Sequence, residues 1–455
     1  MRCSVMSHLP LLSQSSPEAI FAWRRGRPVL VQEFLADVEH LAVALPEARH
    51  VLNTCSDRYE FCVGFAATVV SGRTSLLPSS RAPDTVAQLR ALAPDLLHLG
   101  DAPGELDLPF LQYPVRRNAV SGAHFAMPMI PADQCVAQVF TSGSTGTPLA
   151  HGKTWGALAH CVRAGAARLG QAADCGPLHL VGTVPPQHMY GFESTLLLAL
   201  QGGAVLSAAH PFYPADIATA LADVPTPRLL VSTPVHLRAL LASGVTLPPI
   251  ALVLCATAPL GHDLACAVEQ HLGAPLLEIY GSTETGQIAS RRTAQTDVWT
   301  LFPEVLLTAA ADGTLQAQGG HLAAPVPLSD DVDRIDTQNF RLIGRHADMV
   351  NIAGKRSSLA HLNHQLLSIP GVDDGAFHMP DDRSAGVPRL MAFAVAPTLP
   401  RQALIEALRQ RVDPAFLPRP LVLLDSLPRN ATGKLPRSAL VALAAEWGSQ
   451  AEARS

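Results

Sequence analysis

The chain has 455 residues, of which 48% are hydrophobic, and its formal net charge is −5. The length predicts more than one domain, and the mild charge, without a block of like charges, argues against a nucleic-acid partner and a disordered tail. No stretch approaches the roughly 18 uninterrupted apolar residues of a membrane span, and the amino-terminal residues lack the apolar run of a signal peptide. The 8 cysteines form no CxxC pair, so we expect a cytoplasmic protein with reduced thiols.

Strand-like and helix-like segments alternate along most of the chain. Residues 51–53 read as a strand, and the helix after them has Asp57 and Glu60 as a capping box and Gly72 as its end. Further apolar strands are expected at residues 135–140, 178–183, 228–232 and 250–255. This alternation predicts an α/β fold with mostly parallel sheets.

The composition changes near residue 330, where residues 329–333 form a polar, acidic loop. The expected elements beyond it are strands at 340–343, 388–396 and 420–424 and helices at 358–368, 401–412 and 436–446. About 110 residues with their own alternation suffice for a small α+β domain. We therefore expect a large domain over residues 1–343, a hinge at 344–348 and a small domain over 349–455.

Lysine is rare in this sequence. Of 33 basic residues only Lys153, Lys355 and Lys434 are lysines, and each follows a glycine. An ammonium is a compact, mobile point charge that suits a phosphate or a reacting oxygen. The three lysines therefore mark three candidate functional regions, with chance persistence of exposed lysines as the alternative.

The first region contains a Ser/Thr/Gly-rich loop, Phe140-Thr-Ser-Gly-Ser-Thr-Gly-Thr-Pro148, directly after an expected strand. Backbone N–H groups and hydroxyls in such a loop can surround an anion. Residues 146–154 almost match the phosphate loop of a P-loop NTPase, but five residues separate the glycines instead of four. Pro148 also removes a backbone donor, so a P-loop NTPase is the weaker interpretation.

Three further motifs follow in order. Ile279-Tyr-Gly-Ser-Thr-Glu-Thr-Gly286 puts a carboxylate beside hydroxyls, which suits Mg²⁺ bound together with phosphates. The next motif combines Asp331 with Gly344-Arg-His-Ala-Asp348 and Asn351-Ile-Ala-Gly-Lys-Arg356, and the last is an exposed loop, Leu427 to Arg437, that contains Lys434.

The four motifs in this order resemble the adenylate-forming (AMP-binding) ligase superfamily, which includes acyl- and aryl-CoA synthetases. The resemblance covers essentially the whole chain, and the combination is far more specific than any single motif. It also resembles a short bacterial branch of acyl- and aryl-acid ligases that accompany aryl-polyene and polyketide-like pathways. The resemblance implies a large adenylate-forming domain and a small mobile domain that rotates between two half-reactions.

The resemblance also implies a role for individual residues. The catalytic residues are then Lys434, Thr283, Glu284 and His188, with Glu284 as the metal ligand. The residues for ATP or AMP are Thr141, Ser142, Gly143, Ser144, Thr145, Gly146, Lys153, Ala256, Thr257, Tyr280, Gly281, Ser282, Asp331 and Arg345. The acid pocket is formed by His188, Tyr190, Phe192, Thr233, Cys255 and Gly286, and the thiol donor meets Gly354, Lys355 and Arg356.

The chain departs from the family pattern in three places. The loop lysine expected at position 149 is a leucine, and Lys153 is the expected replacement, because an ammonium–phosphate contact tolerates loose geometry. Arg356 is followed by serines instead of the glutamates often seen there, and Ala347 stands at the expected hinge position.

We therefore expect an ATP- and Mg²⁺-dependent ligase that forms carbon–sulfur bonds. It activates a carboxylic acid, of an aryl type such as a hydroxybenzoate or cinnamate, as its acyl adenylate, and transfers the acyl group to a thiol. Coenzyme A and a phosphopantetheinyl acyl carrier protein remain alternative thiol donors. A medium-chain fatty acyl ligase and a non-catalytic adenylate-binding protein remain alternative functions.

Overall fold

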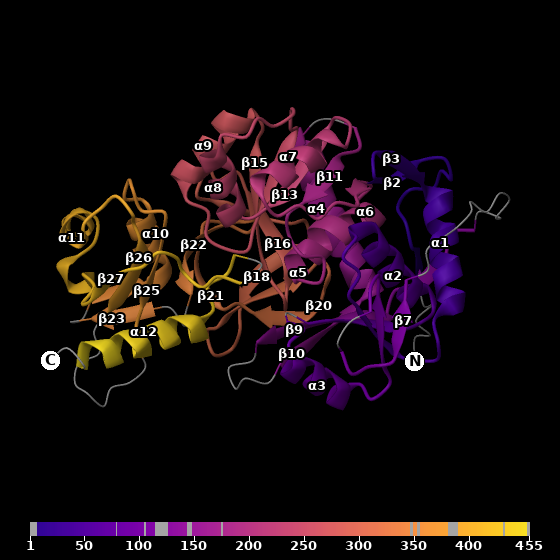
Figure 1. Cartoon of the computed structure of the whole chain (residues 1–455), viewed down its shortest axis with the longest axis horizontal. Helices are drawn as coiled ribbons and strands as arrows, with labels where there is room; N and C mark the ends of the chain where they lie inside the picture. Colours follow the sequence, from indigo (N-terminus) through magenta and orange to yellow (C-terminus); the bar gives the residue numbers. More distant parts are fainter. Residues whose placement is uncertain are drawn as a thin grey trace.

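Two large sheets form most of the molecule (Figure 1). The computed structural model describes residues 7–78, 80–103, 106–113, 126–142, 148–173, 176–345, 349–352, 355–380, 390–430 and 433–452. From edge to edge, the 11-stranded sheet consists of β21 (Asp330–Arg334), β22 (Asn339–Arg345), β17 (Trp299–Leu301), β16 (Gly286–Arg291), β15 (Leu276–Ser282), β14 (Leu252–Cys255), β13 (Arg228–Ser232), β11 (His179–Gly182), β12 (Val205–Ser207), β2 (Ile20–Arg24) and β3 (Arg27–Leu30). The 6-stranded sheet consists of β10 (Pro148–Thr154), β9 (Cys135–Ser142), β5 (Thr74–Leu77), β4 (His50–Asn53), β6 (Leu96–Gly100) and β7 (Phe110–Gln112).

The centres of both sheets are parallel, whereas both edges of the 11-stranded sheet and the β10 edge of the 6-stranded sheet are antiparallel. Strands β15, β14, β13, β11, β12 and β2 run parallel to their neighbours, as do β9, β5, β4, β6 and β7. Parallel strands need long crossover connections, and helices provide most of them here. The expected α/β fold is confirmed, because the strands predicted at 51–53, 135–140, 178–183, 228–232 and 250–255 all exist within a few residues of the expected bounds.

Helices and smaller sheets complete this part of the chain. The helices are α1 (Val31–Ala44), α2 (Arg58–Val70), α3 (Pro83–Leu92), α4 (Trp155–Ala173), α5 (Met189–Gly191), the π-helix η1 (Phe192–Leu197), α6 (Leu198–Gln201), α7 (Pro214–Ala222), α8 (Pro234–Ser243) and α9 (His262–Leu272). The smaller sheets pair β1 (His8–Pro10) with β8 (Met129–Pro131) and join β18 (Val305–Ala309), β19 (Leu315–Gly319) and β20 (Leu322–Pro327). Among the described helices, none combines the length and the hydropathy that a transmembrane segment requires.

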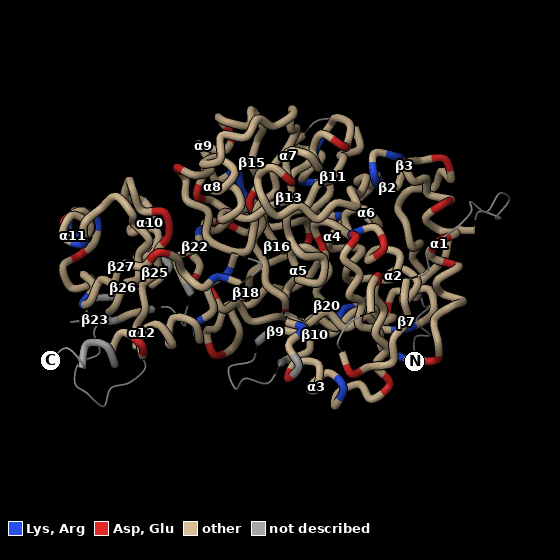
Figure 2. The backbone as a smooth tube through the Cα atoms, in the orientation of Figure 1, with Lys and Arg blue, Asp and Glu red and all other residues tan. Residues whose placement is uncertain are grey.

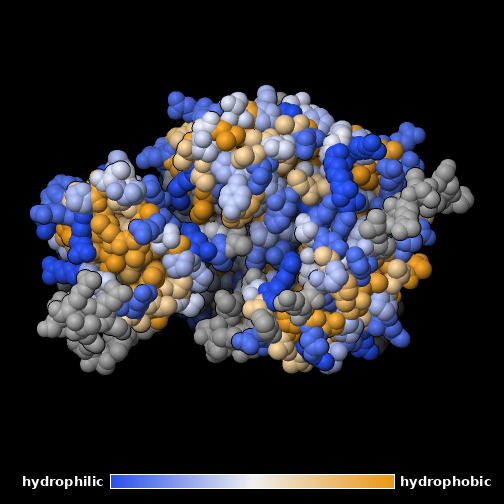
Figure 3. All heavy atoms as spheres, in the orientation of Figure 1, coloured by the Kyte–Doolittle hydropathy of each residue, from blue (hydrophilic) through white to orange (hydrophobic). Residues whose placement is uncertain are grey.

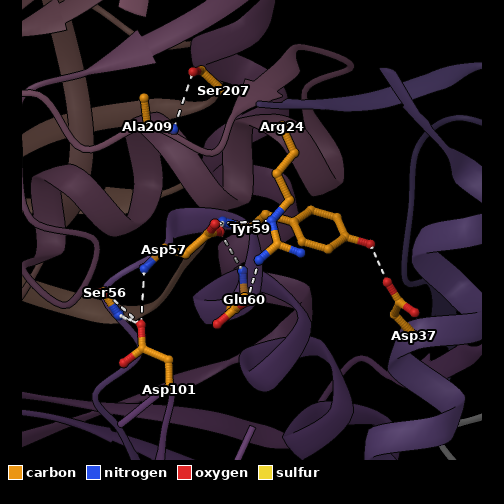
Figure 4. Close-up of polar contacts among 9 residues, drawn as sticks. All are labelled: Arg24, Asp37, Ser56, Asp57, Tyr59, Glu60, Asp101, Ser207 and Ala209. Carbon is orange, nitrogen blue, oxygen red and sulfur yellow. Dashed lines mark hydrogen bonds and ion pairs between the residues drawn. The ribbon is translucent and has the colours of Figure 1, made fainter. Parts of the chain in front are cut away.

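The amino terminus of α2 joins the two large sheets. Asp57 caps the helix by accepting from the backbone N–H groups of Tyr59 and Glu60, as the sequence predicts. The Glu60 carboxylate does not complete a capping box, because it pairs with Arg24 of β2 (Figure 4). Asp101 accepts the Asp57 N–H instead, at 3.4 Å, so α2 is tied to β2 and to the end of β6.

Arg58, the next residue of α2, is 1% exposed and fixes the loop that follows β11. Its guanidinium donates to the carbonyls of Gly182 (2.8 Å) and Val184 (3.0 Å) and to the hydroxyl of Thr195 (3.0 Å). Burial lowers the pKa of Arg58 to about 10. The guanidinium thus anchors the loop that leads to His188.

The carboxy-terminal elements have their own sheet and their own buried clusters. These elements are β23 (Met349–Ile352), β24 (Lys355–Ser358), α10 (Leu359–Leu367), β25 (Asp374–His378), β26 (Met391–Val395), α11 (Arg401–Arg409), the 3-10 helix η3 (Pro414–Phe416), β27 (Leu421–Leu423) and α12 (Arg437–Glu452). The sequence did not predict the hairpin of β23 and β24 or strand β25. One of the two buried clusters of these carboxy-terminal elements includes Leu362, Leu366, Phe377 and Leu404. The carboxy-terminal elements lie at the opposite end of the molecule from α1 (Figure 1). We propose that the carboxy-terminal elements form the mobile small domain. Residues 346–348 of the expected hinge, including Ala347, lie outside the described residues.

Charge and hydropathy are mixed over the surface. Lys and Arg positions and Asp and Glu positions are scattered along the backbone, without a long run of one sign (Figure 2). On the face shown in Figure 3, the most continuous apolar area lies over the carboxy-terminal elements.

Candidate active site

The first Ser/Thr/Gly motif lies in the hairpin of β9 and β10. Thr141 pairs with Leu149 across the ladder, and the Thr141 hydroxyl lies 2.9 Å from Nε2 of His151. The turn at residues 143–147 and the side chain of Ser142 lie outside the described residues. The predicted phosphate contacts of Gly143, Ser144, Thr145 and Gly146 therefore stay predictions.

Strand β10 places two basic side chains against Glu284. His151 and Lys153 are two residues apart on the strand, so their side chains leave the same face. The ammonium of Lys153 donates to the carbonyl oxygen of Glu284 at 3.1 Å, and Nε2 of His151 lies 3.4 Å from Oε1 of the Glu284 carboxylate. Burial lowers the pKa of Lys153, against the opposing effect of the Glu193 and Glu284 charges. This contact places the Lys153 ammonium beside the turn that carries Glu284, and its role as a substitute for the missing lysine at position 149 stays a prediction.

The turn between β15 and β16 carries Thr283 and Glu284. The hydroxyls of Ser282 and Thr285 lie 3.2 Å apart, and each accepts from the other residue's backbone N–H. Gly286, at φ +66°, then starts β16. With these bonds within the turn, Thr283 is half-buried and the Glu284 side chain is 43% exposed.

The Glu284 carboxylate fits the needs of a shared magnesium ion. Burial acts to raise its pKa, but the Ser282 hydroxyl, a backbone hydrogen bond and the charges of His151 and Lys153 lower it overall. Among the described residues, no group of three or more His, Cys, Asp or Glu side chains could hold a metal ion. One ionised carboxylate is nevertheless sufficient for Mg²⁺, because this ion is usually bound by one or two carboxylates together with substrate phosphates.

The predicted nucleotide side is formed by the ends of β14, β15 and β21. Thr257, just after β14, has φ 85°, which is an unusual backbone conformation for a β-branched residue and is typical of ligand-contacting segments. The Tyr280 hydroxyl donates to Asp330 at 2.8 Å, next to Asp331, the predicted ribose contact. The side chain of Arg345 lies outside the described residues. The predicted roles of Ala256 and Gly281, which lie on these same segments, also stay predictions.

Of the residues predicted for the acid pocket, two lie at partly exposed or polar positions and two lie inside hydrophobic clusters. His188 is half-buried, and Gly286 faces the buried Glu193 carboxyl. Phe192 and Cys255, by contrast, are fully buried in hydrophobic clusters, and Phe192 packs edge-on against Phe65 with ring centroids 5.0 Å apart.

Tyr190 and Thr233 also have structural partners. The Tyr190 hydroxyl donates to the carbonyls of Ser232 (3.2 Å) and Leu254 (2.9 Å). Thr233 caps α8 by accepting from the backbone N–H of His236. Both side chains thus stabilise the loops at the carboxyl ends of β13 and β14, and their contact with an acid stays a prediction.

The loop that carries Lys434 is fixed by Arg429. This guanidinium donates to both carboxylate oxygens of Asp374, at 2.7 and 2.6 Å, and to the carbonyl of Gly433 at 2.8 Å. Asn430 accepts the Lys434 N–H at 2.9 Å. Lys434 itself is exposed.

The same loop packs on α8, the helix that follows the central strand β13. Gly433 has φ +75°, and a Cβ atom there would lie 3.1 Å from Val235 and 3.7 Å from the Thr233 hydroxyl. A side chain at position 433 would press on Val235, and the positive φ also favours glycine there. The small carboxy-terminal unit therefore presents Lys434 toward the loop that carries His188.

The charge of Lys434 acts on His188. Burial, followed by the positive charges of Lys434 and Arg81, lowers the pKa of His188 to about 4. His188 is therefore neutral at physiological pH. Arg81 was not singled out in the sequence, because no motif surrounds it.

The predicted thiol-donor segment is only partly described. Lys355 and Arg356 begin β24, but their side chains, like all of Gly354, lie outside the described residues. Their role stays a prediction.

Sequence reasoning missed three groups that the fold brings to this site. They are His151 beside Glu284, the Arg429–Asp374 pair behind Lys434, and the buried Glu193. His151 had a sequence signal, since its spacing of two from Lys153 on a strand predicts a shared face, and Arg429 lies within the Leu427 to Arg437 motif, although nothing in the sequence pointed to its pairing with Asp374.

Comparison with known proteins agrees with this arrangement of motifs. A family model for AMP-binding enzymes matches residues 40–306. The 4-coumarate–CoA ligase of Rhodobacter capsulatus is 31% identical over 297 residues, which cover 64% of this chain and 71% of the relative. That of Halorhodospira halophila is 32% identical over 305 residues, which cover 65% and 73%.

Solved structures share the fold over nearly the whole chain. The o-succinylbenzoate CoA synthetase of Bacillus subtilis, in complex with its acyl-adenylate intermediate, has a TM-score of 0.79 at 17% identity, covering 95% of this chain and 98% of the other. An anthranilate CoA ligase in complex with anthranoyl-AMP has a TM-score of 0.76 at 14% identity, covering 95% of both chains. With motifs, fold and relatives in agreement, this chain belongs to the family of AMP-binding enzymes.

Proposed function

We propose that this chain is an AMP-forming acid–thiol ligase. In the first half-reaction, a carboxylate oxygen of the acid attacks the α-phosphorus of ATP, the bond to the bridging oxygen of the β-phosphate breaks, and pyrophosphate leaves. In the second, a thiol attacks the carbonyl carbon of the acyl adenylate, AMP leaves, and a thioester forms. The reaction takes place in the cytoplasm, where ATP and coenzyme A are available.

The observation that supports this proposal best is the position of Lys434. Its loop packs on α8, and its charge acts on His188 at the entrance to the predicted acid pocket. An ammonium held there would lie between the acid carboxylate and the α-phosphate, where negative charge accumulates in the transition state. Preorganised cations at such a point are usually the largest contribution to catalysis of phosphoryl and adenylyl transfer.

The other residues of the site have complementary roles. Lys153 stabilises the phosphates that leave as pyrophosphate, and it replaces the lysine absent from position 149. Glu284 would hold Mg²⁺, which neutralises phosphate charge when bound. Neutral His188 shapes the passage from the acid pocket to the nucleotide without adding a charge.

The second half-reaction needs a different position of the small domain. Lys434 is exposed on a loop that belongs to the carboxy-terminal elements, so rotation about the hinge at 344–348 would withdraw it and bring β23 and β24 to the thiol. Coenzyme A is the acceptor named in the relatives 4-coumarate–CoA ligase, and we propose it here. An acyl carrier protein remains the alternative acceptor.

The acid is an aryl acid of the hydroxybenzoate or cinnamate class. The test is acid-dependent exchange of labelled pyrophosphate into ATP over benzoates, cinnamates and medium-chain fatty acids, followed by thioester formation with coenzyme A or a carrier protein. We expect exchange with an aryl acid and a thioester with coenzyme A. Exchange with fatty acids alone would change the substrate class, and no exchange with any acid would favour a non-catalytic adenylate-binding protein.

A further inference from the structure

One face of α8 is covered by the carboxy-terminal elements and carries an arginine that belongs to none of the motifs. On the inner side of this helix, Leu237 and Leu240 are buried in a hydrophobic cluster of the large domain. Val235 and Arg238 are three residues apart, so they share another face of the helix, and both are half-buried. Val235 is the residue that Gly433 of the carboxy-terminal elements approaches.

A second contact between the two parts of the molecule lies at the start of α9. A Cβ atom at Gly261, the amino-terminal cap of that helix, would lie 3.6 Å from Cε1 and 3.7 Å from Nδ1 of His364 on α10. Because α8 and α9 pack against each other, the carboxy-terminal elements rest on two neighbouring helices. Arg238 belongs to this interface between the two parts of the chain.

The ion pair that fixes the Lys434 loop lies next to the same face of α8. Arg429 donates to both carboxylate oxygens of Asp374 and to the carbonyl of Gly433. Since Gly433 approaches Val235, the pair is separated by one contact from the helix face that carries Arg238. The Asp374 carboxylate is thus shared between a guanidinium of its own domain and the field of a guanidinium of the other.

Asp374 is the strongest favourable charge near Arg238. Burial lowers the pKa of Arg238; the charge of Asp374 opposes this effect, and the smaller effect of Arg429 adds to it. Within the described part of the chain, no residue accepts a hydrogen bond from the Arg238 guanidinium. A half-buried guanidinium without such an acceptor is costly, so the attraction to Asp374 compensates part of that cost. This compensation exists only while the carboxy-terminal elements rest on α8.

The attraction to Asp374 bears on the position of Lys434. Asp374 holds Arg429, and Arg429 fixes the loop that presents the Lys434 ammonium. A pull on Asp374 therefore acts on the same unit that brings this ammonium to the site. A charge pair that exists in only one of two domain positions shifts the population toward that position.

We propose that Arg238 is a positioning residue, which attracts Asp374 and thereby holds the small domain in the position for adenylation. This inference rests on the proposed ligase function, and it adds a residue of the large domain that sets the balance between the two half-reactions.

The test compares Arg238→Met, Arg238→Lys and Arg238→Glu with the wild type. Pyrophosphate exchange with the best acid of the panel measures adenylation, and thioester formation from the supplied adenylate of that acid measures the second half-reaction. Arg90→Met is the matched control, because Arg90 forms an exposed ion pair with Asp107 on α3, away from α8 in Figure 1. Thermal unfolding shows whether each variant keeps its fold.

We expect Arg238→Met to lower exchange by about three- to tenfold, somewhat more than a fully exposed ion pair contributes. Arg238→Lys should keep most of the wild-type exchange, and Arg238→Glu should lose more than Arg238→Met because it repels Asp374. Thioester formation should be unchanged or faster in all three variants, and Arg90→Met should change neither step. Equal loss of both steps, or equal loss in Arg238→Lys and Arg238→Met, would overturn the positioning role.

A second measurement does not depend on activity. After burial, the charges of Lys434 and Arg81 lower the pKa of His188, so this pKa reports whether Lys434 is in place. In Arg238→Met, the His188 midpoint measured by NMR should rise part of the way toward its value in Lys434→Ala. It should stay at the wild-type value in Arg90→Met.

The two measurements separate failure of this inference from failure of the ligase function. An unchanged His188 midpoint in Arg238→Met would refute the inference, even where exchange confirms the ligase. A raised midpoint without exchange by any acid would overturn the ligase function and still support the role of Arg238 in holding the small domain.

Discussion

Two lysines, Lys153 and Lys434, reach the candidate active site from different parts of the molecule, and each is held in a different way. Lys153 belongs to a strand of the 6-stranded sheet, is half-buried and donates to the Glu284 carbonyl. Lys434 is exposed on a loop of the carboxy-terminal elements, and a separate guanidinium, Arg429, fixes that loop from behind. This contrast agrees with our proposal that Lys153 stays in the phosphate site and that Lys434 is brought to the site and withdrawn from it.

The largest effect should come from Lys434→Ala. We expect adenylation, measured by pyrophosphate exchange, to fall by about 100- to 1,000-fold, the typical loss for one preorganised transition-state contact. Thioester formation from supplied acyl adenylate should be nearly unchanged, because Lys434 acts only in the first half-reaction. Equal loss of both steps would contradict a cation that is withdrawn.

Lys153→Ala should have a smaller effect that is confined to the nucleotide. We expect the KM for ATP to rise or kcat to fall by about 10- to 100-fold, the value of one charge-assisted phosphate contact. The KM for the acid should change less than the KM for ATP, because the Lys153 ammonium donates to the Glu284 carbonyl rather than to a residue predicted for the acid pocket. Unchanged exchange kinetics with ATP would mean that Lys153 does not replace the missing lysine.

Arg429→Ala should weaken adenylation through the position of Lys434. The variant loses the Asp374 pair and the bond to the Gly433 carbonyl, and we expect a fall in exchange of about tenfold, which corresponds to one hydrogen bond of a charged group. Arg409→Ala is the matched control, because Arg409 forms an exposed ion pair with Glu406 on the same domain. If both variants behave alike, Arg429 does not position Lys434.

The smallest effect concerns the titration of His188. The pKa of His188 in the folded protein is about 4, below the ordinary 6.5. Between about pH 4 and pH 6.5, the unfolded chain therefore binds more protons than the folded chain. The contribution of His188 to the free energy of unfolding should therefore be present above pH 6.5 and decline as the pH falls toward 4. In Lys434→Ala, the His188 midpoint measured by NMR should rise, whereas in Lys153→Ala it should not move.

The features that the sequence predicted correctly depend on residues that are neighbours in the chain. The cap at Asp57, the strand before each motif and the order of the four motifs are local patterns, and the structure contains those strands and that cap. Glu60 illustrates the limit, because its carboxylate leaves the expected capping box for Arg24, which lies 36 residues away.

The features that the sequence did not predict depend on packing between residues that are far apart in the chain. The Arg429–Asp374 pair joins residues 55 positions apart, and no spacing rule connects them. Glu193 reads as an ordinary polar helix residue until α4 and β16 bury it, and a π-helical turn has no sequence signature of its own. The phosphate loop was predicted from its motif and stays a prediction, because residues 143–147 lie beyond the described part of the chain.

The central claim is that the carboxylate of the acid attacks the α-phosphorus of ATP, and isotope transfer tests it most directly. The acid is labelled with ¹⁸O in both carboxylate oxygens and incubated with ATP, Mg²⁺ and coenzyme A, and the products are examined by mass spectrometry. We expect one ¹⁸O atom in AMP and none in pyrophosphate, because the attacking oxygen stays on the α-phosphorus when the thiol displaces AMP. Label in inorganic phosphate with formation of ADP, or unlabelled AMP in the presence of thioester, would contradict the account.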